Sequence, residues 1–133
     1  MSGVHVRLRV GGESYALAVE NVLEVAELGD LAVVPGARPE ALGVRNLRGQ
    51  ILPVFDLAAL FGVQRPDVPQ RLLVAESDGR RAGFAIDEVS DVGELPEPAE
   101  ETESDLLLGA ALAGDDLVGV VDVKRLFAAL ERG

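Results

Sequence analysis

Apolar and polar residues alternate strictly over residues 4–10, with valine or leucine at every even position and histidine or arginine at every odd one. A period of two predicts a strand with one buried face and one solvent-exposed face. The segment Gly11-Gly12-Glu13 predicts a hairpin turn, and residues 15–19 predict the returning strand. The chain is therefore expected to open on a β-hairpin.

Shorter apolar runs follow along the chain. Five of them predict further strands, at residues 44–47, 51–55, 71–76, 82–86 and 117–121. Residues 20–28 fit both a short helical turn and a strand, so a turn that runs into a strand is expected there. Residues 31–34 are a short apolar run, and residues 39–42 predict one helical turn with Pro39 at its first position, ended by Gly43.

Two short helices are expected, each directly after an aspartate. Asp56 and Asp122 are suitable N-caps for helices over residues 57–61 and 123–130, because a carboxylate oxygen can accept a hydrogen bond from a backbone N–H group of the first turn. A glycine follows the first helix, as is typical of a helix C-terminus. The proline-containing segment 64–70 predicts the crossover between two halves of the chain.

The sequence contains an internal repeat. Residues 17–28 match residues 84–95 without a gap at a spacing of 67, and residues 51–61 match residues 117–127 at a spacing of 66. Five positions are identical in the first match and four in the second. Two matches in the same order, at nearly the same spacing, predict two similar halves.

The repeat and the elements together predict the fold class. We expect a mainly β protein of two small barrels with short helices. The first subdomain is placed at about residues 10–65 and the second at about residues 70–125, with the terminal segments packing across. Units of this size bury little apolar surface alone, so the two are expected to share a hydrophobic core.

Composition excludes several classes of partner and of catalytic site. The chain has 133 residues, 48% of them apolar, with 23 acidic and 12 basic residues and a formal charge of −11. Nucleic acid and anionic membranes are poor partners because their phosphates would be repelled. The absence of cysteine and the single histidine exclude disulfides, thiolate catalysis and multi-histidine metal sites. No uncharged run exceeds nine residues and no signal-peptide core is present, so a cytoplasmic protein without direct membrane insertion is expected.

Candidate catalytic chemistry is sparse. Neither glycine-rich phosphate-binding motif occurs. A hydrolase or metabolite-binding barrel that uses clustered carboxylates stays open, although one tyrosine and four phenylalanines are few for stacking a substrate. Residues 87–105, expected to form a bend and then a loop, hold nine acids and no base, and make either a solvated surface or a docking patch for a basic partner. His5 is expected to face solvent.

The segment Gly43-Val-Arg-Asn-Leu-Arg-Gly49 places two arginines next to a tight turn in an otherwise acidic protein. Arg48 lies in or beside that turn. It either pairs with a nearby carboxylate, from Glu20 or Glu24, and fixes the turn, or presents its planar guanidinium group to a partner. The two roles are compatible.

These residues resemble the CheW-like domain family. The pattern Asn46-Leu-Arg-Gly49 followed by Ile51-Leu-Pro-Val-Phe-Asp-Leu57 carries the resemblance, and Val22-Leu-Glu-Val25 and Gly83-Phe-Ala-Ile-Asp-Glu-Val-Ser-Asp-Val92 extend it over nearly the whole chain. The family implies a single CheW-like domain over residues 1–133. It also implies two five-stranded SH3-like barrels that share an apolar seam, which agrees with the repeat.

The resemblance further implies an adaptor of bacterial chemotaxis without catalysis, cofactor or metal. Such an adaptor joins the cytoplasmic tips of methyl-accepting chemoreceptors to the regulatory domain of the histidine kinase CheA, in receptor arrays near the inner membrane. The partner-binding positions that carry over are Val22, Glu24, Val25, Gly43, Asn46, Arg48, Gly49, Gly83, Val89 and Val92.

The second half departs from the family pattern at its turn. Ala113-Gly114-Asp115-Asp116 stands where Leu47-Arg48-Gly49-Gln50 stands in the first half. An arginine-mediated contact is therefore expected in the first half alone. A CheV-type fusion of this domain with a receiver domain is a further alternative, and the sequence assigns no particular receptor, kinase or motility output.

Overall fold

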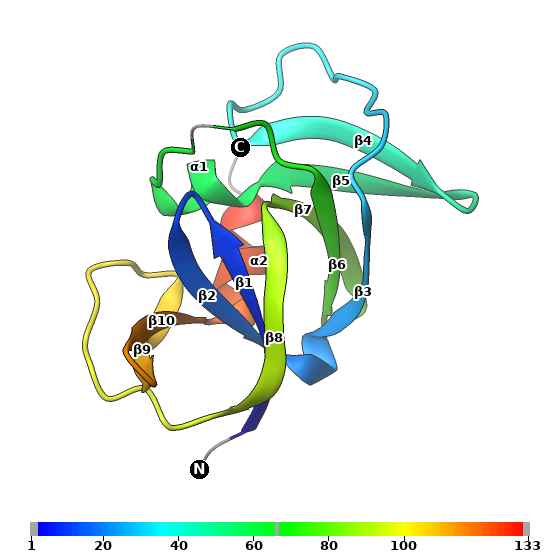
Figure 1. Ribbon diagram of the computed structural model, residues 1–133. Coiled ribbons are helices and arrows are strands. Elements are labelled where there is room, and N and C mark those ends of the chain that lie inside the picture. Colours follow the sequence, from blue (N-terminus) through cyan, green and yellow to red (C-terminus); the bar gives the residue numbers. More distant parts are fainter. Residues whose placement is uncertain (1–2, 66, 132–133) are drawn as a thin grey trace.

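The computed structural model describes residues 3–65 and 67–131, and Pro66 of the predicted crossover lies outside the described residues. The described chain forms ten strands in two five-stranded sheets, so the mainly β class and its two five-stranded units are confirmed. Sheet A has the strand order β8-β1-β2-β10-β9, and sheet B has the order β3-β6-β7-β5-β4 (Figure 1).

The sheets are built from short strands that turns and loops connect. The strands of sheet A are β1 (Gly3–Val10), β2 (Glu13–Ala18), β8 (Glu88–Leu95), β9 (Leu107–Ala113) and β10 (Asp116–Val121). The strands of sheet B are β3 (Val22–Glu27), β4 (Ala41–Leu47), β5 (Gln50–Asp56), β6 (Arg71–Ser77) and β7 (Arg80–Ile86). The helical elements are the 3₁₀ turn η1 (Val19–Asn21), α1 (Leu57–Phe61) and α2 (Val123–Leu130).

Each half of the repeat gives its first hairpin to the sheet of the other half. The β1–β2 hairpin pairs with β8 and β10, and the β6–β7 hairpin pairs with β3 and β5. The halves expected at about 10–65 and 70–125 therefore do not each form one sheet. The reason is that the chain crosses from one sheet to the other directly after β2 and again directly after β7.

The repeat reproduces the strand register. In sheet B the parallel pair β5–β7 sets Val54 against Gly83, and in sheet A the parallel pair β10–β2 sets Val120 against Ala16. These are matching positions of the two sequence halves, 66 or 67 residues apart. The similarity seen in the sequence is thus a similarity of backbone pairing.

One hydrophobic core lies between the sheets and receives side chains from both. Leu8 and Leu17 of sheet A and Leu73 and Phe84 of sheet B are almost fully buried in it. Both helices contribute to the same core, and α2 lies behind β1 and β8 in Figure 1. Tyr15 stacks on the ring of Phe61, and burial, with a smaller contribution from the Glu13 carboxylate, raises the pKa of Tyr15.

Both helix starts follow the prediction. Asp56 Oδ1 accepts a hydrogen bond from the Ala58 N–H group at 3.2 Å, and Asp122 Oδ1 accepts one from the Arg125 N–H group at 3.2 Å. Gly62 ends α1 with a left-handed backbone, φ 69°. No helix in the described part of the chain is long and apolar enough to cross a bilayer.

Two predictions about local structure were wrong. Residues 39–40 form a turn, in which the Ala41 N–H group donates to the Arg38 carbonyl oxygen at 2.9 Å, but no helical turn continues to residue 42. Strand β4 begins at Ala41 and pairs with β5, so that Gly43 lies inside a strand. Of the bend expected at residues 87–92, only Asp87 is a bend, and residues 88–92 belong to β8, which continues to Leu95 and pairs with β1. In both places strand pairing with a distant segment overrides a short local pattern.

Candidate partner-binding surface

The first group of predicted site residues lies on the edge strands of the two sheets. Val22 and Val25 lie on β3, at the edge of sheet B, and Val89 and Val92 lie on β8, at the edge of sheet A. Both strands follow directly after a crossing between the sheets. The structure therefore places the two predicted segments at equivalent positions.

The two valines of each segment differ in how far they are exposed. Val22 and Val89 are half-buried and pack against the shared core. Beyond a register shift in each strand, Val25 is 41% exposed and Val92 is 56% exposed. The shift does not place the two valines on opposite faces, because Val89 and Val92 pair with Leu8 and with its neighbour two residues away on β1. Each edge strand still offers one exposed valine to solvent.

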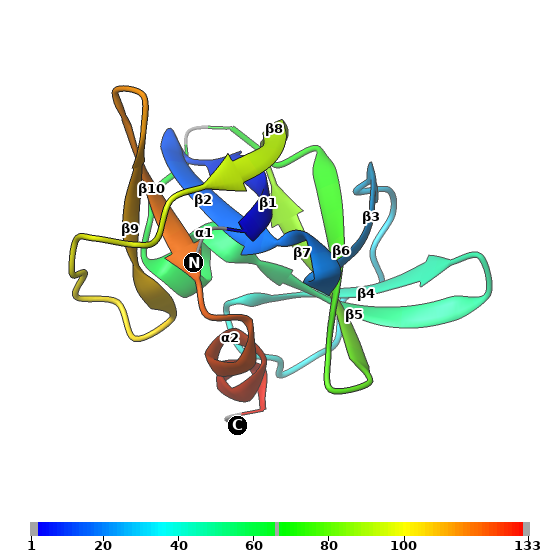
Figure 2. The same cartoon turned by 90° about the horizontal axis from the view of Figure 1, so that it is seen from below.

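The second group lies in the turn between β4 and β5. Arg48 and Gly49 both have positive φ, 51° and 83°, as the type I′ turn of a two-residue hairpin requires. Asn46 Oδ1 accepts a hydrogen bond from the Gly49 N–H group at 3.0 Å and holds the turn. Asn46 and Gly49 are thus turn-forming residues, and the turn extends away from the rest of the molecule (Figure 2).

An ion pair connects the two groups. Arg48 Nη2 donates to Glu24 Oε2, so the turn next to edge strand β4 is joined to the opposite edge strand β3. Of the two carboxylates considered from the sequence, Glu24 is the partner. Both side chains stay accessible, 67% for Arg48 and 32% for Glu24. The arginine therefore fixes the turn and still faces solvent.

The ion pair borders a hollow of about 210 Å³ that opens over the inner residues of sheet B. Arg81 on β7 lines the same hollow and donates to Glu76 at 2.8 Å and to Gln50 at 3.0 Å. The sequence pattern did not single out Arg81. A signal was available, because Glu76 and Arg81 flank the β6–β7 turn and form a cross-strand pair of opposite charge.

The third group, Gly43 and Gly83, is buried. A Cβ atom on Gly83 would lie 2.6 Å from Leu72 Cδ1, and one on Gly43 would lie 2.4 Å from the carbonyl oxygen of Ala32. Gly43 has φ 149°, and it sits where Ala32 and Val44 exchange backbone hydrogen bonds. These two glycines allow close packing behind the surface.

Replacing Gly43 with alanine is expected to lower the free energy of unfolding by about 2 kcal/mol, because an unfavourable φ adds to a backbone clash. Urea unfolding measures the change. Gly109, the matching residue of the second half, has φ 147° and more room, since a Cβ atom there would lie 2.8 Å from the Glu100 carbonyl oxygen. Gly109→Ala should therefore cost less, and an equal or larger loss at Gly109 would contradict the steric explanation.

The described residues contain no cluster of side chains that could hold a metal ion. Within residues 3–65 and 67–131, no three His, Cys, Asp or Glu side chains gather for that purpose. A larger hollow, about 460 Å³, lies beside residues 27–29 and 68–71, away from the predicted site. His5 is half-buried, and its Nδ1 atom lies 2.7 Å from the Gly3 carbonyl oxygen.

Comparison with known proteins gives a consistent result. The family model for the CheW-like domain matches residues 5–131. The chain is 28% identical to the probable chemotaxis protein CheW of Rhizobium etli, over 95% of this chain and 88% of that protein. It is 31% identical to the chemotaxis protein CheW of Helicobacter pylori, over 88% and 76%. The crystal structure of the scaffolding protein TtCheW from Thermoanaerobacter tengcongensis superposes with a TM-score of 0.82 at 27% identity, over 92% and 90% of the two chains.

Proposed function

Since this chain belongs to the CheW-like domain family, whose members are coupling adaptors of chemotaxis, we propose that it joins the cytoplasmic tips of chemoreceptors to a CheA-type histidine kinase without catalysing a reaction. The observation that carries the proposal is the pair of equivalent edge strands, each with an exposed valine after a bulge. An adaptor needs such faces in at least two places.

The geometry supports a different partner for each of two surfaces, the edge strands β3 and β8 and the β4–β5 turn. The receptor's helical tip would pack its apolar side against the half-buried and exposed valines of β3 and β8. The regulatory domain of the kinase would bind the charged β4–β5 turn, where Arg48 is exposed. The proposed setting is the cytoplasmic face of receptor arrays near the inner membrane, with no nucleic acid and no metal or cofactor involved.

Such an adaptor can transfer a signal without catalysing a reaction. Each interface would be small, about 1,200 Å² or less, and weak in isolation. Repetition of weak contacts in an array makes them effective. The adaptor transmits a signal when it binds the active and inactive arrangements with different affinity, and a difference of about 1–3 kcal/mol is enough.

Replacing Arg48 with alanine is expected to weaken kinase binding about tenfold, because a guanidinium contact with a partner is lost. The free energy of unfolding should change by less than about 1 kcal/mol, since the ion pair with Glu24 is solvent-accessible. Calorimetric titration and urea unfolding measure the two effects. Arg125→Ala removes another exposed arginine, which lies 3.5 Å from Asp122, and serves as the control. If the Arg48 variant is strongly destabilised while its folded fraction binds the kinase with unchanged affinity, the role of Arg48 is structural only.

Co-purification with a kinase regulatory domain and a receptor-tip fragment tests the proposal as a whole. We expect the chain to retain both proteins, and to show no saturable heat on titration with small metabolites or divalent metal ions. Failure to bind either protein would refute the adaptor function.

A further inference from the structure

Of the two residues that form the Glu24–Arg48 ion pair of sheet B, only the carboxylate has an equivalent in sheet A. Glu24 lies opposite Val74 on β6, one position before the exposed Val25. In sheet A, Asp91 lies opposite Arg7 on β1, one position before the exposed Val92. Asp91 is thus the carboxylate that corresponds to Glu24 by both register and distance along the repeat.

The arginine of the pair is missing from the second half. Residue 114, which corresponds to Arg48 in the β9–β10 turn, is a glycine, and a Cβ atom there would meet nothing within 4 Å. Gly114 has no side chain that could reach Asp91 as Arg48 reaches Glu24.

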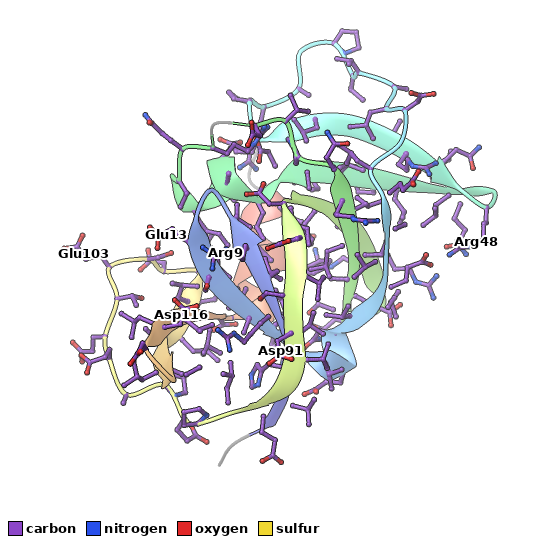
Figure 3. All side chains as sticks on the ribbon, viewed as in Figure 1. Arg9, Glu13, Arg48, Asp91, Glu103 and Asp116 are labelled. Atoms are coloured by element: carbon purple, nitrogen blue, oxygen red, sulfur yellow. The ribbon has the colours of Figure 1, made fainter. Side chains whose placement is uncertain are left out.

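Other cations of sheet A are engaged elsewhere. Arg7, the cross-strand neighbour of Asp91, donates from Nη2 to Asp116 Oδ2 at 3.1 Å. Arg9 donates to Ser14 Oγ at 3.3 Å and to the Gly12 carbonyl oxygen at 2.9 Å. Within the described residues no ion pair joins a cation to Asp91. Figure 3 shows Asp91 on β8, Arg9 on the adjacent strand β1, Asp116 on β10 further across sheet A, and Arg48 at the end of its own turn.

The backbone holds the Asp91 carboxylate in place while leaving it accessible. Asp91 Oδ1 accepts a hydrogen bond from the Val92 N–H group at 2.9 Å, and the residue is exposed. Val92 beside it is 56% exposed. An oriented, exposed carboxylate fits a partner that presents a guanidinium group.

We propose that Asp91 accepts an arginine of the receptor tip, which takes in sheet A the place that Arg48 fills within the chain in sheet B. This inference rests on the proposed adaptor function and names the contact chemistry of the same surface. The receptor is named rather than the kinase because Asp91 lies on β8, the edge strand that carries Val89 and Val92 of the proposed receptor surface.

The test compares Asp91→Asn with the wild-type chain in calorimetric titrations against a receptor-tip fragment and, separately, a kinase regulatory domain. Asparagine keeps the shape and the hydrogen bond to Val92 but removes the charge. We expect affinity for the receptor tip to fall about tenfold and to lose most of its dependence on salt concentration. Affinity for the kinase domain should stay within twofold.

Glu88→Gln is the matched control, because it neutralises another exposed acid of β8 and should change receptor affinity less than twofold. Asp91→Glu should recover most of the binding. Unchanged receptor affinity in Asp91→Asn, or a loss confined to the kinase domain, would overturn the inference. A wild-type chain that binds neither protein would instead refute the proposed function, so the two failures are distinguishable.

Discussion

Replacing Val92 with aspartate is expected to lower affinity for the receptor tip by 100-fold or more, which corresponds to about 2.7 kcal/mol. The change places a carboxylate without a partner in an apolar contact, and desolvation of that charge opposes binding. Val92 is 56% exposed and contributes little to the core, so the fold should be retained. Titration calorimetry against the receptor tip measures the affinity, and thermal unfolding verifies the fold.

Val33→Asp provides the matched control, because Val33 is 78% exposed in the loop between β3 and β4, outside the proposed surface. It should leave receptor affinity within twofold. Equal losses in the two variants would show that added negative charge, rather than the position on β8, weakens binding. Val22→Asp is a less direct test, because Val22 packs against the shared core and its replacement also affects folding.

Replacing Asp56 with alanine is expected to lower the free energy of unfolding by about 4 kcal/mol. Asp56 is 8% exposed and caps α1, and its Oδ2 atom lies 2.6 Å from Arg65 Nη2. The side chain of Arg65 is only 22% exposed, so removal of the carboxylate leaves a partly buried cation without its anion. Arg65 also donates to the Asp67 carbonyl oxygen, which secures the crossover. Urea unfolding measures the loss.

The corresponding change in the second half should be much milder. Asp122 caps α2, but the nearest cation, Arg125, lies 3.5 Å away and is 65% exposed. Asp122→Ala should therefore cost about 1 kcal/mol, the usual contribution of a helix cap. Similar losses at the two positions would show that the cap, and not the contact with Arg65, determines the stability contributed by Asp56.

The sequence was sufficient for elements that a local pattern determines. Strict alternation identified β1, and an aspartate before an apolar run identified both helix starts, because the period of a strand and the chemistry of an N-cap are written within a few residues. Strands β4 and β8 were harder to predict. Residues 39–42 and 87–92 carry turn-like signals, and only pairing with β5 and β1 makes residues 41–42 and 88–92 strands.

The candidate site was predictable to different degrees. The repeat located the matching valines of β3 and β8, and the charge of Arg48 suggested its pairing with a carboxylate. The role of Gly43 was not visible in the sequence, because it depends on the approach of the Ala32 carbonyl oxygen from the next loop. Asp91 was not singled out, since its significance appears only when the strand registers of the two sheets are compared.

The exchange of hairpins between the halves has a consequence for synthesis on the ribosome. Within the first half, the described strands pair with one another only as two hairpins, β1–β2 and β4–β5. Their remaining strand partners, and the partner of β3, belong to the second half. A lone hairpin is marginally stable in water. A nascent chain that ends before β6 therefore carries unpaired strand edges, and sheet A becomes complete only when β10 has emerged. This domain can therefore hold its shape only after its last strand has been synthesised.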